Sequence, residues 1–188
     1  MKMINVAVIG SGLIGRAWAV VFAKAGHQVM MYDTDPACRE GVAASVKAEC
    51  EILHRHGLLS DISAVLNRIN VSSDLSQAVQ AADFIQENGP ERVEVKQALF
   101  AELDSLAPAD TPIASSTSAI PASQFTQTLT VGTDVLSVIR LTRLIWFLWL
   151  RYAGRPGHLL RCWTGLMKFT TQAAWFLFGS RQKNRALC

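Results

Sequence analysis

The sequence predicts an α/β fold in which helices cover both faces of a doubly wound, mainly parallel sheet. Residues 4–9 form a short apolar run rich in β-branched residues, which is typical of a buried strand, and Gly10 ends it. Residues 13–25 are apolar and rich in Ala, as expected of a buried helix. Strand-like and helix-like segments then alternate as far as residue 116. This order favours parallel strands joined by helices.

Turn and capping residues set the boundaries of the elements that follow. Gly26 is a suitable C-cap for the first helix, and Asp33 closes the strand over residues 28–32. Pro36 can begin the next helix because its fixed φ suits the first helical position. Asp74 can cap a later helix. The other expected elements are helices at 36–56, 61–68, 74–82 and 91–106, and strands at 70–72, 83–87 and 112–116.

A glycine-rich turn joins the first strand to the first helix. In its GxGxxG sequence, Gly10 permits a tight turn, Gly12 lets the backbone approach a pyrophosphate, and Gly15 lets the helix pack closely on the sheet. The helix start directs unpaired N–H groups and the positive end of its dipole at the phosphates. Asp33 follows at the expected separation of roughly 20 residues. Its carboxylate can accept both ribose hydroxyls of NAD and would repel the 2′-phosphate of NADP, and no Arg immediately follows it.

These features predict a Rossmann-type, NAD-binding sheet; the alternative is a glycine-rich turn without a ligand. Three longer segments carry a family resemblance: VAVIGSGLIGRAWA from Val6, ADFIQENGPERVEVKQALFAELD from Ala82, and IASSTSAIPASQF from Ile113. They resemble the NAD-binding domain of the 3-hydroxyacyl-CoA dehydrogenase family, in particular the branch containing lambda-crystallin, L-gulonate 3-dehydrogenase and carnitine dehydrogenase. The resemblance covers about residues 3–126. It implies hydride transfer to NAD from a 3-hydroxy acid or a 3-hydroxyacyl-CoA.

The resemblance also implies roles for single residues. Leu13 and Ile14 match loop positions whose backbone faces the dinucleotide, and the acid that ends the second strand matches the ribose acid. Glu91 and Lys96 match an acid and a base that line the NAD site, although from sequence alone they could be an exposed pair on a helix. Ser118 matches the serine that contacts the substrate hydroxyl, and the alternative is an ordinary serine in a polar turn.

The general base of this chemistry is missing from its expected place. Removal of a hydride from a secondary alcohol needs a base for the hydroxyl proton. The resemblance implies a His in an HPxNPP or HxxNP segment, oriented by a downstream Glu. None of His27, His54, His56 and His158 lies in such a segment. We expect His27, at a helix exit, and His54 and His56, near a helix end, to be surface residues without a catalytic role.

The composition changes sharply after Asp134. Residues 1–134 hold all 15 Asp and Glu beside 9 Lys and Arg, whereas the 54 later residues hold 9 Lys and Arg, no acid and four of the five Trp. The net charge of +3 therefore hides an acidic body and a basic tail, and it does not indicate nucleic-acid binding. We divide the chain into an incomplete NAD-binding domain at 1–130 and a tail at 131–188 that is expected to be poorly ordered or loosely helical.

A shifted reading frame accounts for this tail. Residues 138–158 can be back-translated with permitted codons and read from the third base of the Val138 codon. The result is HPVNPPYLVPLVEVCGAPWT, which resembles the missing catalytic segment with its His, its NPP turn and its downstream Glu. We hypothesise that the frame slips between about Gln124 and Val131, so that the family's domain is truncated and an out-of-frame peptide follows.

Other accounts of the tail remain open. A transmembrane helix needs about 20 apolar residues, whereas residues 144–150 give only seven between two arginines. A basic helix on a membrane surface would place Arg140, Arg143 and Arg151 on one face, opposite Trp and Leu. The corresponding alternative to a damaged enzyme is a catalytically silent NAD-binding module whose tail binds a partner or a membrane surface.

The cysteine spacing and the first residues of the chain indicate its cellular context. The four cysteines show no CxxC pair and no zinc-type spacing, which favours reduced thiols and no metal site. No signal peptide is visible. We therefore expect a cytoplasmic chain with NAD as its cofactor, no nucleic-acid partner and no membrane span. The resemblance implies a homodimer, whose interface would be lost together with the helical C-terminal domain, and we expect negligible turnover.

Overall fold

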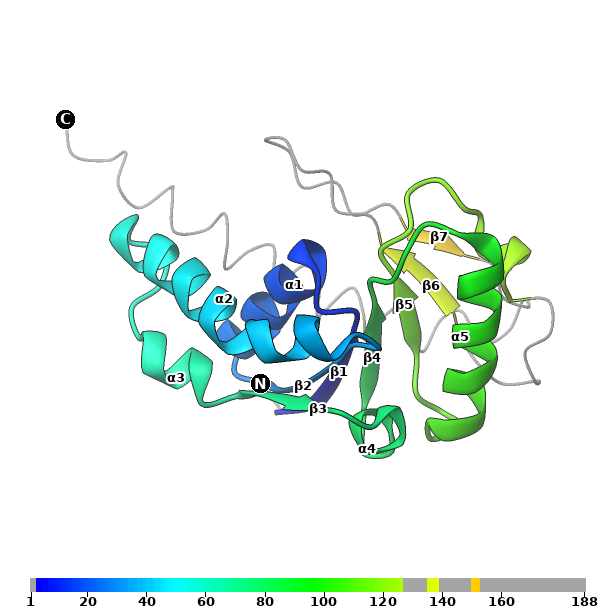
Figure 1. Ribbon diagram of the computed structural model, residues 1–188, viewed down its shortest axis with the longest axis horizontal. Helices are drawn as coiled ribbons and strands as arrows, with labels where there is room; N and C mark the ends of the chain where they lie inside the picture. Colours follow the sequence, from blue (N-terminus) through cyan, green and yellow to red (C-terminus); the bar gives the residue numbers. More distant parts are fainter. Residues whose placement is uncertain (1–2, 127–134, 139–149, 153–188) are drawn as a thin grey trace. The chain divides into compact units, whose positions relative to one another are not determined.

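The computed structural model describes residues 3–126, 135–138 and 150–152. The expected strands and helices of the first 116 residues are present, with ends that shift by a few residues (Figure 1). In chain order the elements are β1 (Asn5–Ile9), α1 (Leu13–Lys24), β2 (Gln28–Tyr32), α2 (Pro36–Arg55), α3 (Ile62–Leu66), β3 (Ile69–Ser72), α4 (Leu75–Val79), β4 (Phe84–Glu87), α5 (Val93–Leu106), β5 (Ile113–Ser115), the 3₁₀ turn Ala122–Gln124, β6 (Val135–Val138) and β7 (Leu150–Tyr152).

The sheet confirms the doubly wound, mainly parallel prediction. Its strand order is β3-β2-β1-β4-β5-β6-β7. All neighbours from β3 to β6 pair in parallel, and β7 pairs antiparallel with β6. The chain moves outward from β1 to β3 and then returns to place β4 on the other side of β1. Ligands of open α/β sheets bind at the carboxyl ends of the strands where the order reverses, which here lies between β1 and β4.

Alternate side chains of β1 enter two separate cores. Ala7 and Ile9 are buried in a cluster with residues of α4 and α5, among them Val79 and Phe100. Val8 points to the opposite face, where α1 packs. In Figure 1, α1, α2 and α3 lie together on one side of the sheet and α5 lies on the other. Burial on both faces explains why the strand reads as a continuous apolar run.

Aspartate side chains begin three of the helices. Asp35 accepts a hydrogen bond from the Ala37 amide at 2.9 Å at the start of α2, and Asp74 caps α4 through the Ser76 amide at 2.8 Å. Asp61 caps α3 in the same way. Gly26 follows α1 with a φ of +95°, the left-handed conformation that favours glycine. The predicted cap at Asp74 and the helix start at Pro36 are therefore confirmed. The C-cap of α1 is Ala25, and Gly26 is the left-handed residue that follows it.

Two stretches of the expected tail are strands. β6 pairs in parallel with β5, and β7 follows it in the sheet. The Val- and Leu-containing segment of β6 suits a strand, and it covers an edge of β5 that would otherwise stay open. The sheet therefore continues beyond the domain boundary that we expected at residue 130, because β6 belongs to it. The other tail residues, including His158 and 144–149, lie outside the described residues. Within the described ranges, no helix has the length and apolar character needed to cross a membrane.

Candidate functional site

The glycine turn lies at the carboxyl end of β1, beside the switch point. Gly10 has a φ of +91°, and a Cβ there would lie 2.9 Å from the main-chain oxygen of Asn88. A Cβ on Gly15 would overlap the main-chain oxygen of Gly10. A Cβ on Gly12 would meet no atom of the described residues within 4 Å. Gly10 and Gly15 therefore fulfil the conformational and packing roles that the motif predicts, while Gly12 leaves open space beside the backbone.

The start of α1 is free of side-chain capping. Gly12 is the N-cap residue, no side chain among the described residues caps the helix, and its first turn has no acid. The first N–H groups of a helix lack intrahelical partners, so this end suits an anion. Leu13 is 67% exposed and Ile14 is half-buried, so both loop positions named from the resemblance lie at the surface of the turn.

Asp33 ties the end of β2 to the glycine turn. Its Oδ2 accepts hydrogen bonds from the amide of Ser11 at 2.7 Å and from the Ser11 hydroxyl at 3.0 Å. Its Oδ1 accepts from the amide of Asp35 at 3.1 Å. The amide of Gly10 donates to the main-chain oxygen of Tyr32 at 2.8 Å, which adds a second link between turn and strand. The carboxylate is thus held beside the glycine turn.

Lys96 forms a buried ion pair that the sequence analysis missed. Its Nζ lies 2.8 Å from both carboxylate oxygens of Glu87, and the two residues are 1% and 0% exposed. Glu87 also accepts hydrogen bonds from the Gly89 amide at 2.6 Å and from the Ser115 hydroxyl. The alternative that Lys96 and Glu91 form an exposed pair on one helix is wrong, because α5 begins after Glu91 and Lys96 is buried. The signal in the sequence for its partner, Glu87, was an acid at the end of the buried strand β4.

Glu91 and Ser118 lie together. One oxygen of the Glu91 carboxylate accepts from the amide of Ser118 at 2.7 Å and from its hydroxyl at 3.1 Å. The other accepts from the Thr117 hydroxyl at 3.2 Å and the Ala119 amide at 3.4 Å. Partial burial raises the pKa of Glu91, but these hydrogen bonds outweigh it and hold the pKa below its usual value. The structure therefore joins two of the predicted site residues directly.

Ser116 connects the elements around the switch point. Its hydroxyl accepts hydrogen bonds from the Trp18 indole at 3.2 Å and the Gln86 amide at 2.9 Å, and it donates to Asn88 Oδ1 at 2.7 Å. These four residues come from α1, the end of β4 and the turn after β5. The sequence analysis assigned them no role. Polar residues at the carboxyl ends of neighbouring parallel strands could have revealed them.

The histidines divide by burial. His27 is 1% exposed and its Nδ1 accepts from the amide of Ile4 at 3.3 Å, so the expected surface position is wrong. The ring is enclosed because residue 27 leads into β2 alongside the start of β1. Burial lowers the pKa of His27. His54 and His56 are exposed, as predicted.

Together, the parallel sheet, the glycine turn and the clamped acid define a dinucleotide-binding domain of the Rossmann type. Residues 5–138 match the family described as 3-hydroxyacyl-CoA dehydrogenase, NAD binding domain. The chain belongs to this family, and its cofactor is NAD.

Known relatives share this part of the chain. A lambda-crystallin homolog from Bos taurus is 40% identical over 119 residues, which cover 62% of this chain and 37% of the relative. An L-carnitine dehydrogenase from Streptomyces griseus is 39% identical over 117 residues, covering 62% and 34%. The structure of 3-hydroxybutyryl-CoA dehydrogenase from Escherichia coli K12 superposes with a TM-score of 0.69 at 30% identity, covering 76% and 30%. The chain thus spans little more than a third of the length of these curated relatives.

Proposed function

We propose that this chain provides the NAD-binding part of an oxidoreductase that transfers a hydride from a 3-hydroxy acid, or from its acyl-CoA thioester, to NAD. The single observation that supports this most is the open space at Gly12, beside an uncapped helix start and the fixed carboxylate of Asp33. The backbone of the glycine turn, including Leu13 and Ile14, would hold the pyrophosphate, and Asp33 would hold the adenosine ribose.

In this proposal, residues that follow the carboxyl ends of β4 and β5 would contact the substrate. Ser118 would contact the substrate hydroxyl, and Glu91 fixes the turn that carries it. Glu91, which is exposed, would line the nicotinamide half of the cofactor site. Lys96 would support that site only from behind, because it is buried against Glu87. The HPVNPP string of the shifted frame favours a small 3-hydroxy acid over an acyl-CoA, and the similarity to an L-carnitine dehydrogenase supports the same preference.

The chain as written would turn over very slowly. None of its histidines lies in an HPxNPP segment, and loss of a general base typically costs about 10²- to 10⁴-fold in rate. We attribute the change of composition after Asp134 to a slip of the reading frame, which would also remove the family's dimer interface. We place the chain in the cytoplasm. The coding DNA tests the slip: an alternative frame must encode HPVNPP, and its absence from all frames would refute this explanation.

Substitution of Gly12 tests NAD binding without disturbing the fold. Among residues 3–126, 135–138 and 150–152, an alanine Cβ at Gly12 meets no atom within 4 Å, and the φ of −63° suits any residue, so Gly12→Ala should fold normally. The added methyl would occupy space that the pyrophosphate needs. We expect titration by NADH fluorescence to show binding to the wild-type chain and at least about tenfold weaker binding to the variant, or 1.4 kcal/mol.

Gly41→Ala is the matched control, because a Cβ at this position on α2 also meets no atom within 4 Å in the part of the chain that the structure describes. It should bind NADH like the wild type, and circular dichroism should show that all three proteins are folded. Equal NADH affinity in Gly12→Ala and the wild type, or no NADH binding by the folded wild type, would contradict the proposed function.

A further inference from the structure

The peptide units around Gly12 are held on both sides, although glycine itself imposes little order on the backbone. A glycine leaves room for a close approach, but it also leaves the chain free to adopt many conformations. The amide of Ser11 donates to Asp33 Oδ2 at 2.7 Å. The main-chain oxygen of Ser11 accepts from Arg16 Nη1 at 3.1 Å, and that of Gly12 accepts from the amide of Arg16 at 3.0 Å. Arg16 therefore fixes the carbonyl oxygens before and after the flexible residue.

These hydrogen bonds set the direction of the Gly12 amide. The Ser11 carbonyl and the Gly12 N–H belong to one planar trans peptide unit, in which the two groups point in opposite directions. Because the Arg16 side chain holds the carbonyl oxygen, the N–H is directed to the other side. A rotation of this peptide unit would exchange the two groups, and a carbonyl oxygen would then face the place from which an N–H can bind an anion.

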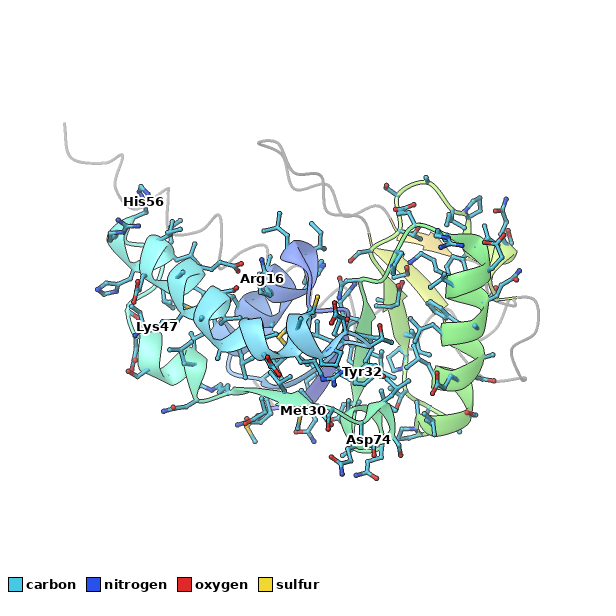
Figure 2. All side chains as sticks on the ribbon, viewed as in Figure 1. Arg16, Met30, Tyr32, Lys47, His56 and Asp74 are labelled. Carbon is cyan, nitrogen blue, oxygen red and sulfur yellow. The ribbon has the colours of Figure 1, made fainter. Side chains whose placement is uncertain are left out.

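Glu49 holds Arg16 in this position from a different helix. Arg16 lies on α1, which packs against α2 (Figure 2), and its Nε donates to Glu49 Oε1 at 3.1 Å. The rigid guanidinium group donates to both partners at once, through Nε to Glu49 and through Nη1 to Ser11, which an ammonium group on a flexible stem does not reproduce. The positive charge of Arg16 is already paired with a carboxylate, so its direct attraction for another anion is weakened.

We propose that Arg16 and Glu49 are positioning residues for the pyrophosphate site: Glu49 orients Arg16, and Arg16 fixes the Ser11–Gly12 peptide unit so that its N–H faces the bound anion. This inference rests on the proposed dinucleotide site and assigns the order of its flexible turn to two side chains. A turn that adopts the binding orientation for only a fraction of the time binds with an affinity reduced by that fraction. Neither side chain needs to touch the cofactor for this effect.

The sign of the Glu49 effect separates positioning from simple electrostatics. Glu49→Met removes a negative charge near the pyrophosphate site, so Coulomb attraction alone would make NADH bind more tightly. Positioning predicts the opposite, about five- to tenfold weaker NADH binding in fluorescence titration of the full chain, because the peptide unit is then held for a smaller fraction of the time. Arg16→Lys keeps the positive charge but loses the paired donors, and it should weaken NADH binding to a similar extent.

A double variant tests whether Glu49 acts through Arg16. Arg16→Met should weaken NADH binding about tenfold, and the addition of Glu49→Met should cause no further loss, because the residue through which it acts is gone. Lys47→Met and Glu51→Met are the matched controls, since both residues are exposed charges on α2 and Figure 2 labels the first of them. Both controls should bind NADH like the wild type.

Urea denaturation shows which variants are folded under the conditions of the titration. Glu49→Met and Arg16→Lys each test the inference separately, so one folded variant is sufficient. NADH affinity equal to or higher than that of the wild type in either folded variant would overturn the inference, while NADH binding by the wild type stands. A folded wild-type chain that does not bind NADH would overturn the proposed function and this inference together.

Discussion

Glu87 and Lys96 are charged residues that protein atoms enclose completely. The desolvation of such a pair offsets much of its Coulomb attraction, so the intact pair stabilises the fold only weakly. A single partner left behind is far more costly, because its charge then has neither water nor a counter-ion. The Glu87 carboxylate also leaves no room for a side chain at Gly89, since a Cβ there would lie 2.8 Å from the Glu87 Oε1.

Neutral substitutions should reveal this coupling. We expect Glu87→Gln and Lys96→Met each to lower the free energy of unfolding by about 3–5 kcal/mol, and the double variant to recover most of the loss. Urea denaturation measures all three. Glu94→Gln, an exposed acid on α5, is the control and should change stability little. A double variant as unstable as the sum of the single variants would show that the pair is not energetically coupled.

At the scale of elements, the Glu91 carboxylate links the β4–α5 connection to the turn that follows β5. Glu91 lies between β4 and α5, and it accepts four hydrogen bonds from residues 117–119, which follow β5. Two of the donors are main-chain amides that no strand or helix satisfies. The geometry of the turn that carries Ser118 therefore depends on the ionised form of a residue that is distant in sequence.

This dependence predicts a pH effect on the turn. The pKa of Glu91 is depressed in the folded chain, so its hydrogen bonds stabilise the turn above the usual value near 4.5 and are lost as pH falls through the depressed pKa. Hydrogen exchange at the amides of Ser118 and Ala119, corrected for the intrinsic rate, should show protection at pH 6 that declines in acid.

Glu91→Gln should remove most of this protection at every pH, because a carboxamide accepts less strongly than a carboxylate. Glu94→Gln should leave it unchanged. Full protection in the Glu91 variant at pH 6 would mean that other contacts hold the turn.

At the scale of the whole molecule, the two cores meet across one buried sheet. His27, a buried titratable residue, lies directly before β2 of this sheet. Its ring lies beside the start of β1, where its Nδ1 accepts from Ile4, and burial favours the neutral form. Protonation of this ring therefore opposes folding of the entire domain rather than of one loop.

Global stability should consequently fall in mild acid. The folded-state pKa of His27 is lowered, so the unfolded chain binds more protons below the usual value near 6.5, and the free energy of unfolding decreases as pH drops through that value. Urea denaturation between pH 5 and 8 should show this slope, and His27→Asn, which keeps an acceptor, should reduce it. The exposed His54→Gln and His56→Gln are controls. An unchanged slope in His27→Asn would assign the acid sensitivity to other groups.

The sequence alone determined the alternation of strands and helices, the glycine turn, Asp33 as the acid after β2, and membership of the family. These features are local: side-chain periodicity sets the elements, and the Gly10 and Gly15 positions have steric reasons that a short segment carries. The helix starts at Pro36 and Asp74 were equally readable, because a fixed φ and a side-chain cap act within a few residues of themselves. The cap at Asp35 came only from the structure.

Only the tertiary structure decided which residues meet. Lys96 pairs with Glu87 rather than with Glu91, Glu91 binds the turn of Ser118, and Arg39 folds back to Asp33. Each contact depends on the register of neighbouring strands or on the face that a helix turns to the sheet. Periodicity does not specify these relations, because many pairings satisfy the same pattern of buried and exposed positions. The partner of a buried charge is therefore a property of the assembled sheet.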